Sequence, residues 1–172
     1  MPAGLGVSSR TIDSGLASVD WPGRWQRLVL GGRLTFLDSS HNPEGAGVLD
    51  SNLASLRAET GRPIVAIVGA LGTMRAGALL EVLGRHCRDI HLVVPRQSRA
   101  STHKELEELI PRTFRGRAFR SEAEELFPSP GTCMAGGAGD VIVVTGSIYL
   151  LGEVLGRLEP QRGPGEGRLQ DF

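Results

Sequence analysis

Leu34 to Gly47 reads LTFLDSSHNPEGAG, an apolar run that ends on Asp38 and is followed by a short polar turn. The run predicts a buried strand. The Asn-Pro-Glu sequence at 42–44 predicts a helix start, because Asn42 can cap the helix, proline suits its first position and glutamate favours the positive end of its dipole. Ligands bind beyond the carboxyl ends of strands in open α/β sheets, so Asp38 and His41 are candidate contacts. An ordinary strand-to-helix connection with a surface histidine accounts for the same residues.

The alternation of apolar runs and amphipathic segments continues along the chain. Ala46, Leu49, Leu53 and Leu56 recur every three or four residues, which predicts a helix that ends at Gly61. The continuous apolar run at 64–69 is typical of a strand covered on both faces, and therefore of a mostly parallel sheet. Further strands are predicted at Gln26–Leu30, Leu34–Asp38, Ile90–Val94, Ala118–Arg120 and Val141–Val144, and a closing helix at Ile148–Leu158.

Glycines and capping residues separate these elements. The pair Gly31-Gly32 predicts a tight antiparallel hairpin between the first two strands. Capping boxes at Thr102–Glu105 and Ser121–Glu124 predict the starts of two short helices. The cluster Gly136–Gly139 precedes a strand instead of following one, so we interpret it as a surface loop and not as a nucleotide loop. The pattern predicts an α/β fold, a three-layer domain with a mostly parallel sheet of about six strands and an N-terminal antiparallel hairpin.

The composition narrows the classes of function. The chain has 172 residues, with 19 acids and 19 bases, so it suits one domain and no net charge points to nucleic acid or a membrane. Cys87 and Cys133 are too few for a disulfide framework, and no apolar stretch reaches the length of a signal or a membrane span. We expect a cytoplasmic protein without a metal site. His86, His91 and His103 have no partner at ligand spacing and are interpreted as structural.

The chain contains a single lysine, Lys104, in the charged pattern THKELEEL. A phosphate-binding P-loop requires GxxxxGK[ST], whose lysine reaches the outer phosphates. This sequence therefore contains no Walker-type phosphate site, which limits what it can do with ATP by itself.

A second candidate site follows the last predicted strand. Thr145-Gly146-Ser147 joins that strand to the closing helix, so the Ser147 hydroxyl and the first helical N–H groups should lie at the same sheet edge as Asp38 and suit an anion. A serine at this position is more often only a helix cap, and the two roles are compatible.

Three motifs occur in order: Trp21-Pro22-Gly23-Arg24, the Asp38–Pro43 turn (DxxHNP), and the Asp140–Ser147 strand and turn (DVIVVTGS). Together they resemble the PGR, DxxHNP and DxxLVTGS motifs of the folylpolyglutamate synthase/dihydrofolate synthase family, in the Mur ligase superfamily. The similarity extends from about Ile12 to Leu158 and concerns the C-terminal third of those enzymes.

The resemblance implies the Rossmann-like fold of a Mur ligase C-terminal domain at 21–159, preceded at 1–20 by a remnant of the central domain and linker and followed at 160–172 by a disordered tail. It implies that Arg24 and Asp38 contact ATP and that His41 and Ser147 bind L-glutamate. The complete ligase would activate a folate or dihydropteroate carboxylate as an acyl phosphate, with ATP and magnesium. The phosphate and magnesium sites would lie in the N-terminal and central ATPase domains, so this chain alone should carry no catalytic residue and be inactive.

Two departures and two alternatives accompany this interpretation. The family often has Gly-Ala where this chain has Ser39-Ser40, and charged residues where it has Leu71–Arg75, so contact of that loop with substrate stays open. A peptidoglycan Mur ligase C-terminal domain is the nearest alternative, although its usual DxYAH aromatic is missing. A stand-alone, non-catalytic binding module is the other, and a GxxGK[ST] segment upstream in the reading frame would exclude it.

Overall fold

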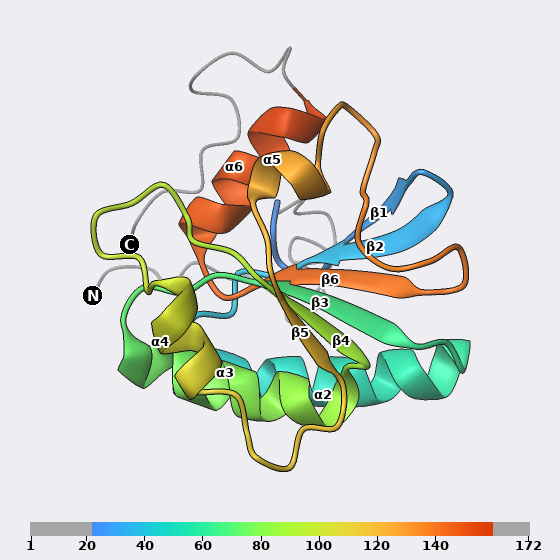
Figure 1. Ribbon diagram of the computed structural model, residues 1–172. Coiled ribbons are helices and arrows are strands. Elements are labelled where there is room, and N and C mark those ends of the chain that lie inside the picture. Colours follow the sequence, from blue (N-terminus) through green and yellow to red (C-terminus); the bar gives the residue numbers. More distant parts are fainter. Residues whose placement is uncertain (1–21, 160–172) are drawn as a thin grey trace, which may run out of the picture.

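The computed structural model describes residues 22–159 (Figure 1). The interpretations of 1–20 as a linker and of 160–172 as a disordered tail, like Trp21 of the first motif, lie outside the described residues. Between them the elements follow in the order β1 (Gln26–Leu30), β2 (Arg33–Leu37), α2 (Pro43–Thr60), β3 (Ile64–Val68), α3 (Thr73–His86), β4 (Asp89–Leu92), α4 (His103–Glu108), β5 (Arg117–Arg120), α5 (Ala123–Leu126), β6 (Val141–Thr145) and α6 (Ile148–Leu158).

The six strands form one sheet in the order β1-β2-β6-β3-β4-β5. Only β1 and β2 pair antiparallel, across the turn at Gly31-Gly32, and all other neighbours are parallel. The predicted fold class is therefore confirmed. The last strand, β6, lies between β2 and β3 in the middle of the sheet, so the carboxyl ends of β2 and β6 are neighbours.

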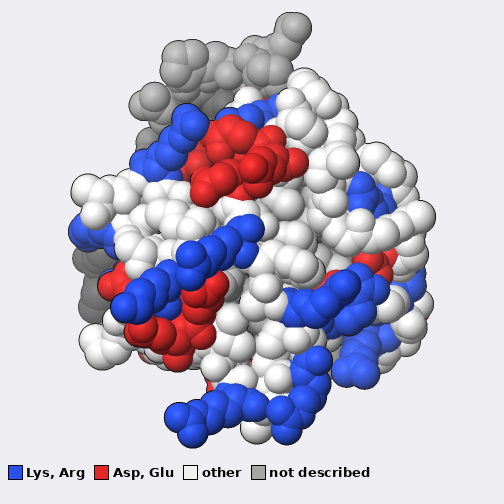
Figure 2. Space-filling view, viewed as in Figure 1, with Lys and Arg blue, Asp and Glu red and all other residues white. Residues whose placement is uncertain are grey.

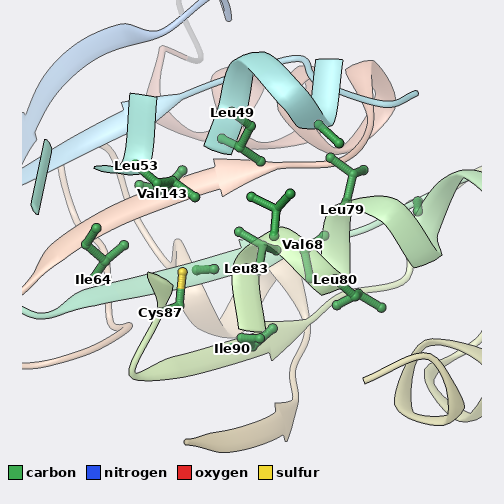
Figure 3. Packing of buried hydrophobic residues seen from close by; sticks show 14 of the residues in the cluster. Leu49, Leu53, Ile64, Val68, Leu79, Leu80, Leu83, Cys87, Ile90 and Val143 are labelled. Atoms are coloured by element: carbon green, nitrogen blue, oxygen red, sulfur yellow. The ribbon is translucent and has the colours of Figure 1, made fainter. Parts of the chain in front are cut away.

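Helices cover both faces of the sheet (Figure 1). Helices α2, α3 and α4 lie on one face and α5 and α6 on the other, and each face has its own apolar core. Figure 3 shows Leu49 and Leu53 of α2 and Leu79 and Leu83 of α3 pointing toward the sheet strands. All four leucines have no exposed surface, and truncation of such a side chain to alanine costs about 2–5 kcal/mol.

The capping residues decide where most helices begin and end. Asn42 Oδ1 accepts the Gly45 N–H at 2.8 Å at the start of α2, and Gly61 ends the helix in the left-handed conformation, with φ of 60°. The Thr102–Glu105 capping box of α4 is present as predicted. The predicted box at Ser121 is wrong: Glu122 is the cap residue of α5, and the Ser121 hydroxyl lies 2.8 Å from His91 Nδ1.

In the part of the chain that the structure describes, every helix is too short or too polar to cross a membrane.

Candidate functional site

The turn that follows β2 is held by its own side chains. Asp38 is the first residue after the strand, and its Oδ1 accepts the Ser40 N–H at 3.0 Å. The Ser40 hydroxyl donates to the Gly45 carbonyl at 3.1 Å and thereby ties the turn to the first turn of α2. The backbone N–H of Asp38 donates to the Val144 carbonyl of β6 at 2.9 Å. These bonds keep the carboxylate at the carboxyl edge of the sheet.

His41 is exposed on the same turn, and one hydrogen bond orients its ring. Its Nδ1 lies 2.7 Å from the Ser39 carbonyl oxygen. Because a carbonyl oxygen only accepts hydrogen bonds, Nδ1 carries the proton, and the neutral ring keeps Nε2 as an acceptor. When the ring is protonated, Nε2 becomes a donor that suits a carboxylate.

A cavity of about 460 Å³ lies at this edge, and we call it the Asp38 cavity. Arg24, Asp38 and His41, three of the four predicted site residues, line it together. The other lining residues are Trp25, Ser39, Ser40, Asn42, Glu44, Gly45, Val48 and Asn52. The cavity is thus lined by a guanidinium, an imidazole and two carboxylates, which suit a polar ligand with both hydroxyl and anionic groups.

Ser147, the fourth predicted residue, does not line the Asp38 cavity. Its side chain is buried, and its hydroxyl oxygen caps α6 by accepting the Tyr149 N–H at 3.1 Å. The preceding Gly146 N–H donates to the Ser40 carbonyl at 3.0 Å. The turn after β6 is therefore joined to the turn after β2, and Ser147 lies immediately behind that junction.

Trp25 is a cavity residue that the sequence motifs did not single out. Its φ of 51° lies in the left-handed region, an uncommon conformation for a bulky residue that costs on the order of 1–3 kcal/mol and is often found at ligand sites. The ring stacks on Phe36, with centroids 4.7 Å apart. The lining residues Val48 and Asn52 were also missed; both lie on α2 but outside its buried face of Ala46, Leu49, Leu53 and Leu56.

The loop after β3 lies at the same edge of the sheet. Leu71 forms an isolated antiparallel bridge with Ala100, and α3 begins at Thr73. The next residue, Met74, is 92% exposed. The Leu71–Arg75 segment, where the sequence departs from the resembled pattern, therefore has an exposed methionine at this edge.

Among residues 22–159, no group of three or more His, Cys, Asp or Glu side chains could hold a metal ion. Asp38 and Glu44 are the only carboxylates in the Asp38 cavity, and Asp38 Oδ1 is already engaged by the backbone. A protein site for magnesium does not fit these residues. The arginine and the carboxylate do fit a nucleotide, as partners for phosphate and for ribose hydroxyls.

Comparison with known proteins supports the resemblance to the family. No protein-family model matches the chain. The dihydrofolate synthase/folylpolyglutamate synthase of Escherichia coli strain K12 is 28% identical over 164 residues, which cover 95% of this chain and 37% of that protein. The resemblance to this family is thus confirmed in sequence. The chain spans little more than a third of the length of the relative it matches.

Solved structures confirm the fold. E. coli FolC in complex with DHPP and ADP has a TM-score of 0.73 and 24% identity, and the match covers 93% of this chain and 36% of FolC. Folylpolyglutamate synthase from Thermotoga maritima has a TM-score of 0.67 and 24% identity, with 96% of this chain and 37% of that chain covered. The bifunctional enzyme from Yersinia pestis has a TM-score of 0.66 and 25% identity, with 88% and 34% covered.

Proposed function

We propose that this chain is the C-terminal domain of an ATP-dependent ligase that joins L-glutamate to the carboxylate of a folate or dihydropteroate through an acyl phosphate. The observation that carries the proposal is the meeting of Arg24, Asp38 and His41 at the Asp38 cavity. Arg24 belongs to the first motif and precedes β1, whereas Asp38 and His41 belong to the second motif and follow β2. Solved relatives include one with Mn, AMPPNP and L-glutamate bound.

Arg24 and Asp38 form the nucleotide side of the proposed site. A guanidinium matches phosphate oxygens, and the carboxylate can accept hydrogen bonds from ribose hydroxyls. Asp38 keeps its second oxygen for this purpose, because its turn bond uses only Oδ1. Trp25 and Val48 add apolar surface to the same cavity.

His41 and Ser147 form the glutamate side of the proposal. His41 Nε2 would donate to a substrate carboxylate when the ring is protonated. The Ser147 hydroxyl uses its oxygen to cap α6 but retains a proton to donate. Because Ser147 is buried behind the Gly146–Ser40 junction, the carboxylate would approach along the first turn of α6, where the helix dipole also favours an anion.

The chain would supply only one wall of the reaction site. With Lys104 as its single lysine and no P-loop, it lacks the group that holds the outer phosphates of ATP. The ATP-binding and magnesium sites of the complete ligase would be completed by further domains, and ATP would supply the acyl phosphate chemistry there. The residues of this chain would bind and orient nucleotide and glutamate as the domains close.

Titration of the 172-residue chain with MgATP tests the nucleotide side. We expect binding in the millimolar range, since a few exposed contacts rarely exceed about −4 kcal/mol, and no ATP-dependent glutamate ligation. In ¹⁵N-resolved NMR spectra, binding at the Asp38 cavity should shift the signals of residues 24–25 and 38–45. Arg24→Ala and Asp38→Asn should weaken these shifts, and Arg112→Ala, an exposed control on the loop between α4 and β5, should not. Micromolar affinity measured at these residues, or ligation by this chain alone, would overturn the proposal.

Glutamate kinetics of the complete ligase test the other side. Ser147→Ala should raise the KM for glutamate more than the KM for ATP, and His41→Ala should do the same. A circular dichroism spectrum and melting curve would check that the loss of the α6 cap, worth about 1 kcal/mol, leaves the domain folded. A larger rise in the KM for ATP than for glutamate would refute the assignment of Ser147.

A further inference from the structure

A second cavity, of about 620 Å³, opens at the opposite edge of the sheet. It lies where α2 and α3 end and β3 begins, and the loop between α4 and β5 forms its remaining wall. We call it the Arg57 cavity. Its lining residues are Arg57, Gly61, Arg62, Pro63, Ile64, Gly84, Arg85, His86, Cys87, Arg88, Thr113, Phe114, Arg115 and Gly116. None of them lines the Asp38 cavity.

The lining of the Arg57 cavity is strongly cationic. Five of its residues are arginines and none is an acid. Figure 2 shows basic side chains at the lower tip of the molecule, where the loop between α4 and β5 lies in Figure 1. A pocket that draws arginines from two helix ends and a distant loop, without a lining carboxylate, has the electrostatics of an anion site.

Two of the five arginines have their charge neutralised by neighbouring acids. Arg85 pairs with Asp50 at 3.2 Å, and Arg88 is held by Asp89 and Asp140 at 2.9 and 2.8 Å. The other three are not neutralised in this way. Arg62 donates only to the backbone carbonyls of residues 138–140.

Arg57 and Arg115 are both exposed, and neither has a carboxylate partner among residues 22–159. Arg115 donates to the Arg112 carbonyl through one nitrogen, which leaves the rest of its guanidinium available. With Arg62, they leave about three positive charges over one cavity.

Interaction with helix dipoles explains only part of this arrangement. Arg57 lies in the last turn of α2 and Arg85 in the last turn of α3, where a cation interacts favourably with the helix dipole. Arg62 and Arg115 lie outside the helices. Stabilisation of the helix ends therefore does not explain why Arg115, on the loop between α4 and β5, also lines the cavity.

The loop that carries Arg115 is fixed in place by close packing. A Cβ atom on Gly116 would lie 1.9 Å from the Arg88 carbonyl oxygen and 2.4 Å from the Phe114 ring, so only glycine allows this approach. Phe114 in turn packs against the core on the α3 side. Arg115 is thus carried by an anchored segment opposite Arg57, which reduces the entropy cost of binding a ligand between them.

We propose that the Arg57 cavity binds a small molecule that carries phosphate groups, through Arg57, Arg62 and Arg115. Guanidinium groups bind phosphate oxygens with charge-assisted, bidentate hydrogen bonds. About three uncompensated positive charges match a diphosphate better than a single carboxylate. A cavity of about 620 Å³ is within the usual range for small-molecule sites. This site is independent of the proposed nucleotide site, from which it is separated by the length of α2.

Calorimetric titration of the 172-residue chain with inorganic pyrophosphate, at about 0.15 M salt, tests the proposal. We expect saturable binding with a Kd below about 1 mM. Arg57→Ala and Arg115→Ala should each weaken it about 5- to 10-fold. Arg75→Ala, an exposed arginine at the other edge, should leave it within about twofold. The first two side chains are exposed, so the variants should fold, and far-ultraviolet circular dichroism would check this.

Four outcomes would overturn the assignment. Absence of saturable binding up to about 10 mM pyrophosphate would show that the cavity is not a phosphate site. Equal weakening by Arg75→Ala would show non-specific charge attraction. Citrate binding as tightly as pyrophosphate would contradict a preference for phosphate. A loss of pyrophosphate binding in Arg24→Ala would instead assign the anion to the Asp38 cavity, so failure here and failure of the proposed function are distinguishable.

Discussion

Asp140 begins the third sequence motif, yet its carboxylate lies at the sheet edge away from the Asp38 cavity. It accepts two hydrogen bonds from the Arg88 guanidinium, at 2.9 and 2.8 Å, and one from the Gly137 N–H at 2.6 Å. The side chain is 5% exposed. We therefore predict that Asp140→Ala lowers the stability of the domain and leaves ligand binding at the Asp38 cavity unchanged.

The size of the effect follows from these three bonds. A hydrogen bond to a charged group contributes about 1.5–3 kcal/mol. The contributions of the three bonds do not simply add, because Arg88 is 43% exposed and keeps Asp89 as a partner in the variant. Discounted for this exposure, the loss should be about 2–4 kcal/mol. For a domain of this size it corresponds to a fall in Tm of about 5–12 °C.

The effect should also depend on pH. Burial acts to raise the pKa of Asp140, but the Gly137 N–H and the Arg88 guanidinium outweigh it, so the folded-state pKa lies below the ordinary 3.8. A depressed carboxyl pKa contributes stability that is fully present above the unfolded pKa and lost as pH falls through the folded pKa. The difference between wild type and Asp140→Ala should hold at neutral pH and shrink as pH falls below about 3.8.

Urea unfolding, followed by circular dichroism at neutral and acid pH, measures both expectations for Asp140. Glu108→Ala is the matched control, because Glu108 is 66% exposed and 4.0 Å from Lys104, a surface pair worth at most about 1 kcal/mol. The reasoning is refuted if Asp140→Ala costs no more than the control, or if its cost is the same at both pH values.

Three further predictions concern other parts of the domain. Gly146→Ala should destabilise the domain by about 2–5 kcal/mol, because φ at Gly146 is 102° and the new Cβ would lie 2.5 Å from the Gly69 carbonyl oxygen. Gly152→Ala, in α6, should stabilise the domain by up to about 1 kcal/mol, because its Cβ would meet nothing within 4 Å. Melting curves of the two variants would contradict the reasoning if either change in Tm had the opposite sign. Burial lowers the pKa of His91 below 6.5, partly opposed by Asp89, so the wild type should lose stability as pH falls from about 6.5 through the lower folded pKa. His91→Asn should lose less stability over that range. Free energies of unfolding from urea curves that fall equally with pH in the two proteins would contradict this. Burial raises the pKa of the Cys87 thiol to about 12, so Cys87 in the native protein should not react with an aromatic disulfide reagent at neutral pH and should react after denaturation. Rapid labelling of Cys87 in the native state would be incompatible with its burial.

Hydrophobic periodicity was sufficient to predict the buried strands and the helices α2 and α6. Ile64–Val68 is buried at every position, as its unbroken apolar run indicated, and Ala46, Leu49, Leu53 and Leu56 are the buried face of α2. Local capping patterns were less reliable. Ser121 has the spacing of a capping box, but its hydroxyl meets His91 on the adjacent strand. A tertiary contact therefore replaced the local one, which the spacing alone could not reveal.

The positions of those candidate site residues that directly follow a strand could be predicted from the sequence. Asp38 and His41 come after β2 in the sequence, so their place at the carboxyl edge follows from the parallel sheet. Trp25 was not predictable, because nothing in the residue type indicates a φ of 51°. The Arg57 cavity was also missed, since its arginines are separated by up to 58 positions and meet only through the folding of a distant loop against two helix ends.

The central place of β6 has a consequence for synthesis on the ribosome. Strands β2 and β3 do not pair with each other, and each waits for β6 as its neighbour. Roughly 70 residues separate β3 from β6, and at about 5–20 residues per second their translation takes about 4–14 s. For that interval the nascent chain has two apolar strand edges without a partner, which exposes it to wrong strand pairing until Val141 to Thr145 emerge.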